Sequence, residues 1–133
     1  MPLSPKVLIV DDEERFRTTL GKLLTVKGLQ VDNVGSAREA LALLGENNYD
    51  VILLDVKMPE MSGVEALAEI KKINSGIEVI ILTGHASVDV AMEIMKLGGY
   101  DYLLKPCPVE ELLAKIETAY DRKREREGRG PKL

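Results

Sequence analysis

Several apolar segments of this sequence end next to residues that could do chemistry. The set consists of Asp11 and Asp12 after residues 6–10, Asp55 at the end of residues 51–55, Thr83 at the end of residues 77–83, and Lys105 after residues 100–104. A charged group at the edge of an apolar interior is costly unless something pairs with it. If these residues meet in the fold, they therefore have to compensate one another or share a ligand.

The chemistry that this set favours is phosphoryl transfer with a metal ion. Three carboxylates in one crevice repel one another, and a divalent cation is the usual remedy. Oxygen ligands without histidine or thiolate favour Mg²⁺, which takes one or two carboxylates together with phosphate oxygens and waters. One carboxylate, Asp55, is then left to attack a phosphoryl group. Lys105 could hold a phosphoryl oxygen as a point charge, and the Thr83 hydroxyl could donate a hydrogen bond to another.

Each residue also has a simpler interpretation. The acidic run 11–14 could only complement the dipole at the N-terminus of a helix. Asp55 could cap a turn, Thr83 could merely end its strand, and Lys105 could be a solvated side chain. Taken together, complementary groups at four strand ends favour the phosphoryl interpretation, since a motif is judged by its context.

The segments that must position these residues alternate between strand and helix patterns. Strands are predicted at residues 6–10, 29–34, 51–55, 77–83 and 100–104. Helices are predicted at residues 14–27, from Ser36 to about 44, from Ser62 to about 70, from Ser87 to 97, and from Pro108 to about 122. Five such strand–helix units predict an α/β fold with a doubly wound parallel sheet and helices on both faces. A ligand crevice is expected beyond the carboxyl ends of the strands.

Length and composition predict one globular domain. The chain has 133 residues, 45% of them hydrophobic and 30% charged. No apolar run is long enough for a membrane span, and the N-terminal segment lacks the apolar stretch of a signal peptide. The single cysteine, Cys107, argues against a disulfide framework and fits a reducing cytoplasm. One cysteine and one histidine also argue against a zinc site.

Charge is distributed unevenly along the chain. Residues 121–133 contain six basic and three acidic residues, a net charge of +3, whereas the other 120 residues contain 12 basic and 19 acidic residues, a net charge of −7. A basic end could contact nucleic acid or a membrane surface, but its mixed signs and its glycines favour a solvated, frayed end. We therefore expect a domain over residues 1–121 and a flexible charged tail, or the start of a linker, over residues 122–133.

The sequence resembles the receiver domain of bacterial two-component response regulators over residues 6 to about 120. The matching features are Asp11-Asp12, Asp55 followed by Met58-Pro59 and Gly63, Thr83-Gly84, and Tyr102 three residues before Lys105-Pro106. The run LTGHASVDVAMEIMKLGGYDYLLKPC looks most like receivers attached to AAA+ transcriptional activators of the nitrogen-regulation type. The resemblance implies a flavodoxin-like sheet with strand order 2-1-3-4-5.

The resemblance also implies a role for each site residue. Asp55 would accept a phosphoryl group from the phosphohistidine of a sensor histidine kinase. Mg²⁺ would be bound by Asp12, Asp55 and the backbone carbonyl of Lys57, with Asp11 holding one of its waters. Lys105 and Thr83 would bind the phosphoryl oxygens, and the peptide before Pro106 would be cis. Such a protein is no enzyme beyond its Mg²⁺-dependent self-phosphorylation and autodephosphorylation.

A conformational switch is the further implication. Phosphorylation would draw the Thr83 hydroxyl towards the new oxygens, and Tyr102 would turn inward, so that the face of the fourth helix, fifth strand and fifth helix changes its partner preference. Seven of the ten residues 88–97 are apolar. This surplus indicates either an adaptable partner surface or a helix that is buried more deeply than usual.

Three side chains near the expected site lie outside the core of the motif. Lys57 and His85 occupy positions, two residues beyond Asp55 and Thr83, where the family tunes phosphoryl lifetime. Our hypothesis is that they alter the access of the attacking water. We assign no chemistry to Cys107, because most single cysteines are inert packing residues.

Competing functions share parts of this pattern. A flavodoxin-like cofactor binder would need a phosphate loop after the first strand, where the sequence is the anionic DDEERF. A haloacid-dehalogenase-type phosphatase would need Asp-x-Asp at that place and usually a cap insertion. A stand-alone interaction module with a non-functioning site remains open, although no site residue is missing.

The expected partners are a sensor kinase, a downstream effector domain or protein, and a second copy of the chain in a phosphorylation-dependent homodimer. The sequence carries no DNA-binding motif, so no direct nucleic-acid binding and no membrane contact are expected. The chain is either a single-domain regulator or a receiver cut from a longer activator that regulates transcription.

Overall fold

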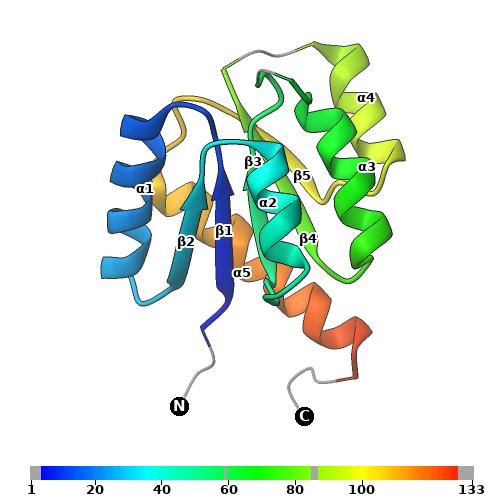
Figure 1. Cartoon of the computed structure of the whole chain (residues 1–133). Helices are drawn as coiled ribbons and strands as arrows, with labels where there is room; N and C mark the ends of the chain where they lie inside the picture. The colour runs from blue at the N-terminus through cyan, green and yellow to red at the C-terminus, as the bar shows by residue number, and fades with distance from the viewer. Residues whose placement is uncertain (1–3, 59, 85–86, 129–133) are drawn as a thin grey trace.

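The computed structural model describes residues 4–58, 60–84 and 87–128, and within these ranges strands and helices alternate along the chain (Figure 1). The strands are β1 (Lys6–Val10), β2 (Gln30–Val34), β3 (Val51–Leu54), β4 (Glu78–Thr83) and β5 (Asp101–Leu104). The helices are α1 (Glu14–Val26), α2 (Ala37–Leu44), α3 (Gly63–Ile73), α4 (Val88–Lys96) and α5 (Val109–Arg126). Not one of these helices has the length and apolar character needed to cross a membrane.

The strands form one parallel sheet in the order β2-β1-β3-β4-β5. This order confirms the flavodoxin-like fold that the sequence predicts. After β2 is added on one side of β1, the chain crosses to the other side of β1 and adds β3 there. β1 and β3 are therefore neighbours, and their carboxyl ends lie at one edge of the sheet. Such a switch point is where ligands bind in open α/β sheets.

Helices cover both faces of the sheet (Figure 1). Alternate strand residues enter the two cores. Val7 and Ile9 pack in the core that contains residues of α1 and α5. Leu8 and Val10 pack in the other core, which contains residues of α2, α3 and α4. Because both faces are buried, the interiors of the central strands are apolar on both sides, and this explains the apolar runs in the sequence.

Serine side chains begin three of the helices, as their spacing predicts. The hydroxyl oxygens of Ser36, Ser62 and Ser87 each accept a hydrogen bond from the backbone N–H three residues later, at 3.1, 3.2 and 3.1 Å. Each bond satisfies one of the N–H groups that a helix leaves unpaired at its first turn.

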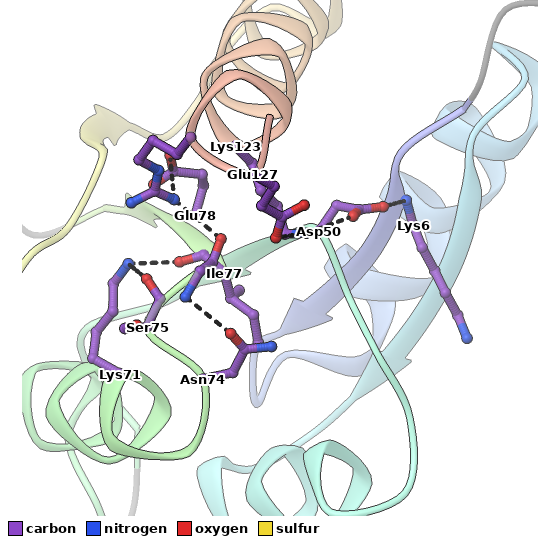
Figure 2. A network of polar contacts seen from close by, with 11 residues as sticks. Lys6, Asp50, Lys71, Asn74, Ser75, Ile77, Glu78, Lys123 and Glu127 are labelled. Carbon is purple, nitrogen blue, oxygen red and sulfur yellow. Dashed lines mark hydrogen bonds and ion pairs between the residues drawn. The ribbon is translucent and has the colours of Figure 1, made fainter. Parts of the chain in front are cut away.

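The end of α5 differs from the prediction. The helix continues to Arg126, beyond the expected end at about Arg122. Lys123 is buried there, with its ammonium 3.3 Å from Asp50 Oδ1 and 2.9 Å from Glu127 Oε2 (Figure 2). Residues 122–126 are therefore an ordered helical segment rather than a frayed end, whereas the domain boundary at 121/122 stays a prediction.

Besides Asp50, Glu78 also pairs with basic residues of α5. Glu78, at the start of β4, is only 1% exposed. Its Oε2 lies 3.1 Å from Arg126 Nη2 and 3.5 Å from Arg122 Nε, and Arg126 also donates a hydrogen bond to the carbonyl of Gly76. The basic residues of α5 thus compensate carboxylates at the amino-terminal edge of the sheet, opposite the predicted site.

An acidic cleft at the carboxyl edge of the sheet

The carboxyl ends of β1, β3 and β5 surround an open cleft of about 800 Å³. Its lining consists of Asp11, Asp12, Glu13, Asp55, Lys57, Met58, Gly84 and Lys105. Thr83, the last residue of β4, lies next to this lining at Gly84 and is fully buried. The structure therefore gathers at one edge the residues that the sequence analysis singled out at the strand ends.

Three carboxylates face one another in this cleft. Asp11, Asp12 and Asp55 each offer an oxygen, and these oxygens all lie within 4.8 Å of one another. Asp11 and Asp55 are 2% and 8% exposed, whereas Asp12 is open to solvent. Oxygen-only ligands with one open side suit a hard divalent cation that keeps part of its water shell. The residues present fit Mg²⁺ in both number and chemistry.

Lys105 provides the positive charge that contacts the carboxylates of the cleft. Its ammonium lies 2.5 Å from Asp11 Oδ2 and 3.4 Å from Asp55 Oδ2. Burial lowers the pKa of Lys105, but the hydrogen bond and the charge of Asp11, helped by Asp55, outweigh burial and raise that pKa above its ordinary value. Burial also raises the pKa of Asp11, and the hydrogen bond from Lys105 offsets only part of that effect. The lysine thus compensates the buried acids, and its shorter contact is with Asp11.

Backbone hydrogen bonds fix the strand ends that carry these side chains. The N–H of Asp55 donates to the carbonyl of Val10 at 3.0 Å, and the N–H of Lys105 donates to the carbonyl of Thr83 at 2.8 Å. The N–H of Glu13 donates to Asp11 Oδ1 at 2.9 Å, which orients that carboxylate. The peptide bond between Lys105 and Pro106 is cis, as the resemblance implies.

Gly63, the first residue of α3, packs directly on the segment that carries Asp55. A Cβ at this position would lie 2.2 Å from the carbonyl oxygen of Asp55 and 2.6 Å from Cα of Val56. The Gly63 N–H donates to the carbonyl of Val56 at 2.7 Å. Only glycine allows this close approach. The packing thus gives a physical reason for Gly63, which is one of the residues that match the receiver family.

Two functional neighbours of the cleft were missed from the sequence. The ring of Phe16 lies under the Lys105 ammonium, which is 4.1 Å from the ring centroid. The guanidinium of Arg17 donates to the carbonyl of Asp11 at 3.1 Å and to Asn33 Oδ1 at 3.0 Å. Phe16 lies in the helix predicted at residues 14–27, and no local signal connects it with Lys105.

Of the two residues proposed for the switch, Thr83 adjoins the cleft, and Tyr102 packs on the core that contains residues of α2, α3 and α4. The Tyr102 hydroxyl is buried and has no hydrogen-bond partner among the described residues. The inward turn of Tyr102 on phosphorylation stays a prediction. Lys57 lines the cleft, and its N–H donates to Asp55 Oδ1 at 3.3 Å. His85 and Pro59 lie outside the described residues.

The structure decides between the two interpretations of the apolar helix α4. Val88, Met92 and Met95 are 74%, 56% and 53% exposed, while Ile94 is fully buried. Val88, Ala91, Met92, Met95 and Lys96 line a shallow apolar groove. The surplus apolar residues therefore lie on the surface, and the interpretation of α4 as an unusually deeply buried helix is wrong.

Comparison with known proteins agrees with this geometry. The chain matches the family model described as "Response regulator receiver domain" over residues 7–117. It is 42% identical over 113 residues to the transcriptional regulatory protein ZraR of Escherichia coli K12, and this match covers 85% of the chain but 26% of ZraR. The chain thus spans about a quarter of the length of this curated relative.

Solved structures give the same result. The beryllofluoride-activated NtrC4 receiver domain dimer superposes with a TM-score of 0.84 at 39% identity, covering 89% of this chain and 98% of that one. A response regulator protein from Burkholderia pseudomallei with a phosphorylated aspartic acid, calcium ion and citrate gives a TM-score of 0.82 at 31% identity, covering 93% and 73%. The fold, the acidic cleft and these matches together show that the chain belongs to the response regulator receiver domain family.

Proposed function

We propose that this chain is the phosphoacceptor of a two-component signalling system and that Asp55 takes a phosphoryl group from the phosphohistidine of a sensor kinase. One observation carries the proposal. Three carboxylates lie within 4.8 Å of one another, and a lysine ammonium contacts two of them. The receiver family is not a class of classical enzymes, so the chemistry is limited to gaining and losing this group.

In the proposed step, an oxygen of Asp55 attacks phosphorus and forms an acyl phosphate. The bond from phosphorus to the kinase imidazole breaks, and the imidazole nitrogen keeps the electron pair. Asp12, Asp55 and the carbonyl of Lys57 would hold Mg²⁺, with Asp11 holding one of its waters. The metal would neutralise charge on the phosphoryl oxygens. The solved Burkholderia relative carries both a phosphorylated aspartic acid and a divalent cation, which supports this assignment by analogy.

Lys105 and Thr83 would bind the other phosphoryl oxygens. The Lys105 ammonium is 3.4 Å from Asp55 Oδ2 and can hold an oxygen of a group attached there. Thr83 would move towards the phosphoryl group, and Tyr102 would follow it. The exposed apolar side chains of α4 would then change their partner, together with β5 and α5.

The output is proposed from the relatives. ZraR is a transcriptional regulatory protein, so this chain would regulate transcription if it is the receiver of a longer activator. The activated NtrC4 receiver is a dimer, which supports phosphorylation-dependent pairing of two copies of this chain. The alternative is a stand-alone regulator that acts by binding another protein. We expect either form to act in the cytoplasm, to which its free cysteine is suited.

Lys57 and His85 would tune the lifetime of the phosphoryl group. Lys57 lines the cleft, where its charge can affect the approach of the hydrolytic water to Asp55. Half-lives of Lys57→Ala and His85→Ala that match the parent would remove this part of the proposal.

Incubation with acetyl phosphate and Mg²⁺, followed by intact-mass measurement, tests the assignment. We expect one phosphoryl adduct on the parent protein, none on Asp55→Asn, and an unchanged adduct on Asp121→Asn, an exposed aspartate of α5. Beryllofluoride with Mg²⁺ should shift the amide NMR signals of residues around the cleft in the parent alone. A parent protein that forms no adduct, or an Asp55→Asn protein that forms it equally well, would refute the proposal.

A further inference from the structure

The ammonium of Lys105 has a neighbour besides the two carboxylates. It lies 4.1 Å from the centroid of the Phe16 ring, within the range of a cation–π interaction. Phe16 is the only phenylalanine of the chain, and its side chain also packs on the core under α1 and α5. The ring is therefore held by the core and presents its face to the cleft.

We propose that Phe16 is a positioning residue whose ring face holds the Lys105 ammonium at the acidic cleft, within reach of Asp55. The contact itself is a property of the folded chain. Its consequence for phosphorylation rests on the proposed function, because the lysine matters there only if a phosphoryl group arrives on Asp55.

The two carboxylates by themselves do not place the lysine well for this task. The ammonium is 2.5 Å from Asp11 but 3.4 Å from Asp55, so ion pairing draws it towards the residue that is not the proposed acceptor. Lysine reaches the cleft on a flexible four-carbon stem with considerable rotamer freedom. A second contact from another direction limits that freedom.

Phe16 supplies a kind of attraction that differs from that of the carboxylates. A metal ion at the carboxylates competes with Lys105 for their negative charge. The ring is neutral and attracts the ammonium through its quadrupole, so its contribution persists when the charges of Asp11 and Asp55 are taken up. Phe16 would thus keep Lys105 in the cleft at the stage when the carboxylates hold it least.

Arg17, the next residue of α1, links the helix that carries Phe16 to the segment that carries Asp11. The Arg17 guanidinium donates to the carbonyl of Asp11 at 3.1 Å, and the backbone N–H of Arg17 donates to the carbonyl of Glu13 at 3.1 Å. The first turn of α1 is therefore hydrogen-bonded to Asp11, the residue that follows β1. A movement of the first turn of α1 away from β1 would have to break the bond between Arg17 and Asp11.

Solution NMR tests the contact without any phosphorylation. Ring currents should move the ε-CH₂ protons of Lys105 upfield of their random-coil position in the parent protein. The upfield shift should persist in Phe16→Tyr, which keeps a ring, and disappear in Phe16→Leu and Phe16→Met, which keep an apolar side chain. Tyr120→Leu is the matched control, since Tyr120 packs on the same core and carries Arg124 over its ring at 5.6 Å. That control should leave the Lys105 signals unchanged.

A kinetic measurement tests the consequence. Without the ring, phosphorylation by acetyl phosphate should slow about fivefold in Phe16→Leu, as expected from one partly buried cation–π contact, and Phe16→Tyr should restore most of the rate. Using both Leu and Met covers the event that one of them folds poorly, and the signals of the unmodified parent test the contact in either case.

The outcomes separate this inference from the proposed function. Random-coil shifts of Lys105 in the parent, or shifts that survive in the Leu and Met variants, would overturn the contact. If the parent shows the expected upfield shift of Lys105 but the parent and Phe16→Leu are phosphorylated at equal rates, the positioning role would be overturned. A parent that shows the ring-current shift but forms no adduct would refute the phosphoacceptor function and with it the kinetic role, while the contact would stand.

Discussion

The pairing of Glu78 with the end of α5 leads to a quantitative prediction about stability. Glu78 is 1% exposed, and its Oε2 lies at ion-pair distance from Arg122 and Arg126, without hydrogen-bond geometry to either. Replacing both arginines by glutamine would leave a buried carboxylate without its cations, whereas replacing Glu78 would leave two arginines that can turn to water. The two perturbations should therefore differ in cost.

The magnitudes follow from the burial of each partner. The arginine side chains are 54% and 41% exposed, so the loss of either one alone should cost up to about 1 kcal/mol. Loss of both should cost more than the sum, because an uncompensated buried charge costs about 3–5 kcal/mol. Burial lowers the pKa of Lys71 and the charge of Glu78 partly offsets this, so Lys71 is near enough to compensate in part. We therefore expect ~3 kcal/mol for the double variant, which corresponds to about 10 °C in Tm.

Urea unfolding followed by circular dichroism measures these differences without the screening that guanidinium would add. Adding Glu78→Gln to the Arg122→Gln/Arg126→Gln variant should recover about 2 kcal/mol, because the buried charge is gone. Arg124→Gln removes the same charge from the same helix but no contact with Glu78, so it should cost less than about 0.5 kcal/mol. A double variant that equals the sum of its singles, or a triple variant no more stable than the double, would refute the reasoning.

Two further predictions concern Gly63 and Tyr49. Gly63→Ala should destabilise the fold by about 2–4 kcal/mol and reduce beryllofluoride binding, since the new methyl group would collide with the backbone of Asp55; unchanged urea unfolding and adduct formation would contradict this. Burial, with the 2.6 Å hydrogen bond to Asp32, raises the pKa of Tyr49 above that of an unfolded tyrosine. The contribution of the protonated Tyr49 hydroxyl to the free energy of unfolding is therefore complete at neutral pH. It is lost as the pH rises above about 10, where the hydroxyl of the unfolded chain ionises first. Stability against pH should fall less steeply in Tyr49→Phe than in the parent, and equal slopes would count against the prediction.

The sequence by itself determined the architecture and the members of the acidic cleft. Apolar runs such as residues 51–54 require burial on both faces, and the helical segments between them supply that burial when the strands are parallel and helices lie on both sides of the sheet. Parallel strands bring their carboxyl ends to one edge. The meeting of Asp11, Asp12, Asp55 and Lys105 therefore follows from their places after these runs, and the structure confirms it.

The tertiary structure decided which groups contact one another across the fold. Lys105 lies closer to Asp11 than to Asp55 and contacts the ring of Phe16, and Arg126 at the end of α5 pairs with Glu78. These contacts join residues that are far apart in the chain, so local periodicity carries no signal for them. They depend on how the helices pack on the sheet, because burial makes each charge find its partner through space rather than along the sequence.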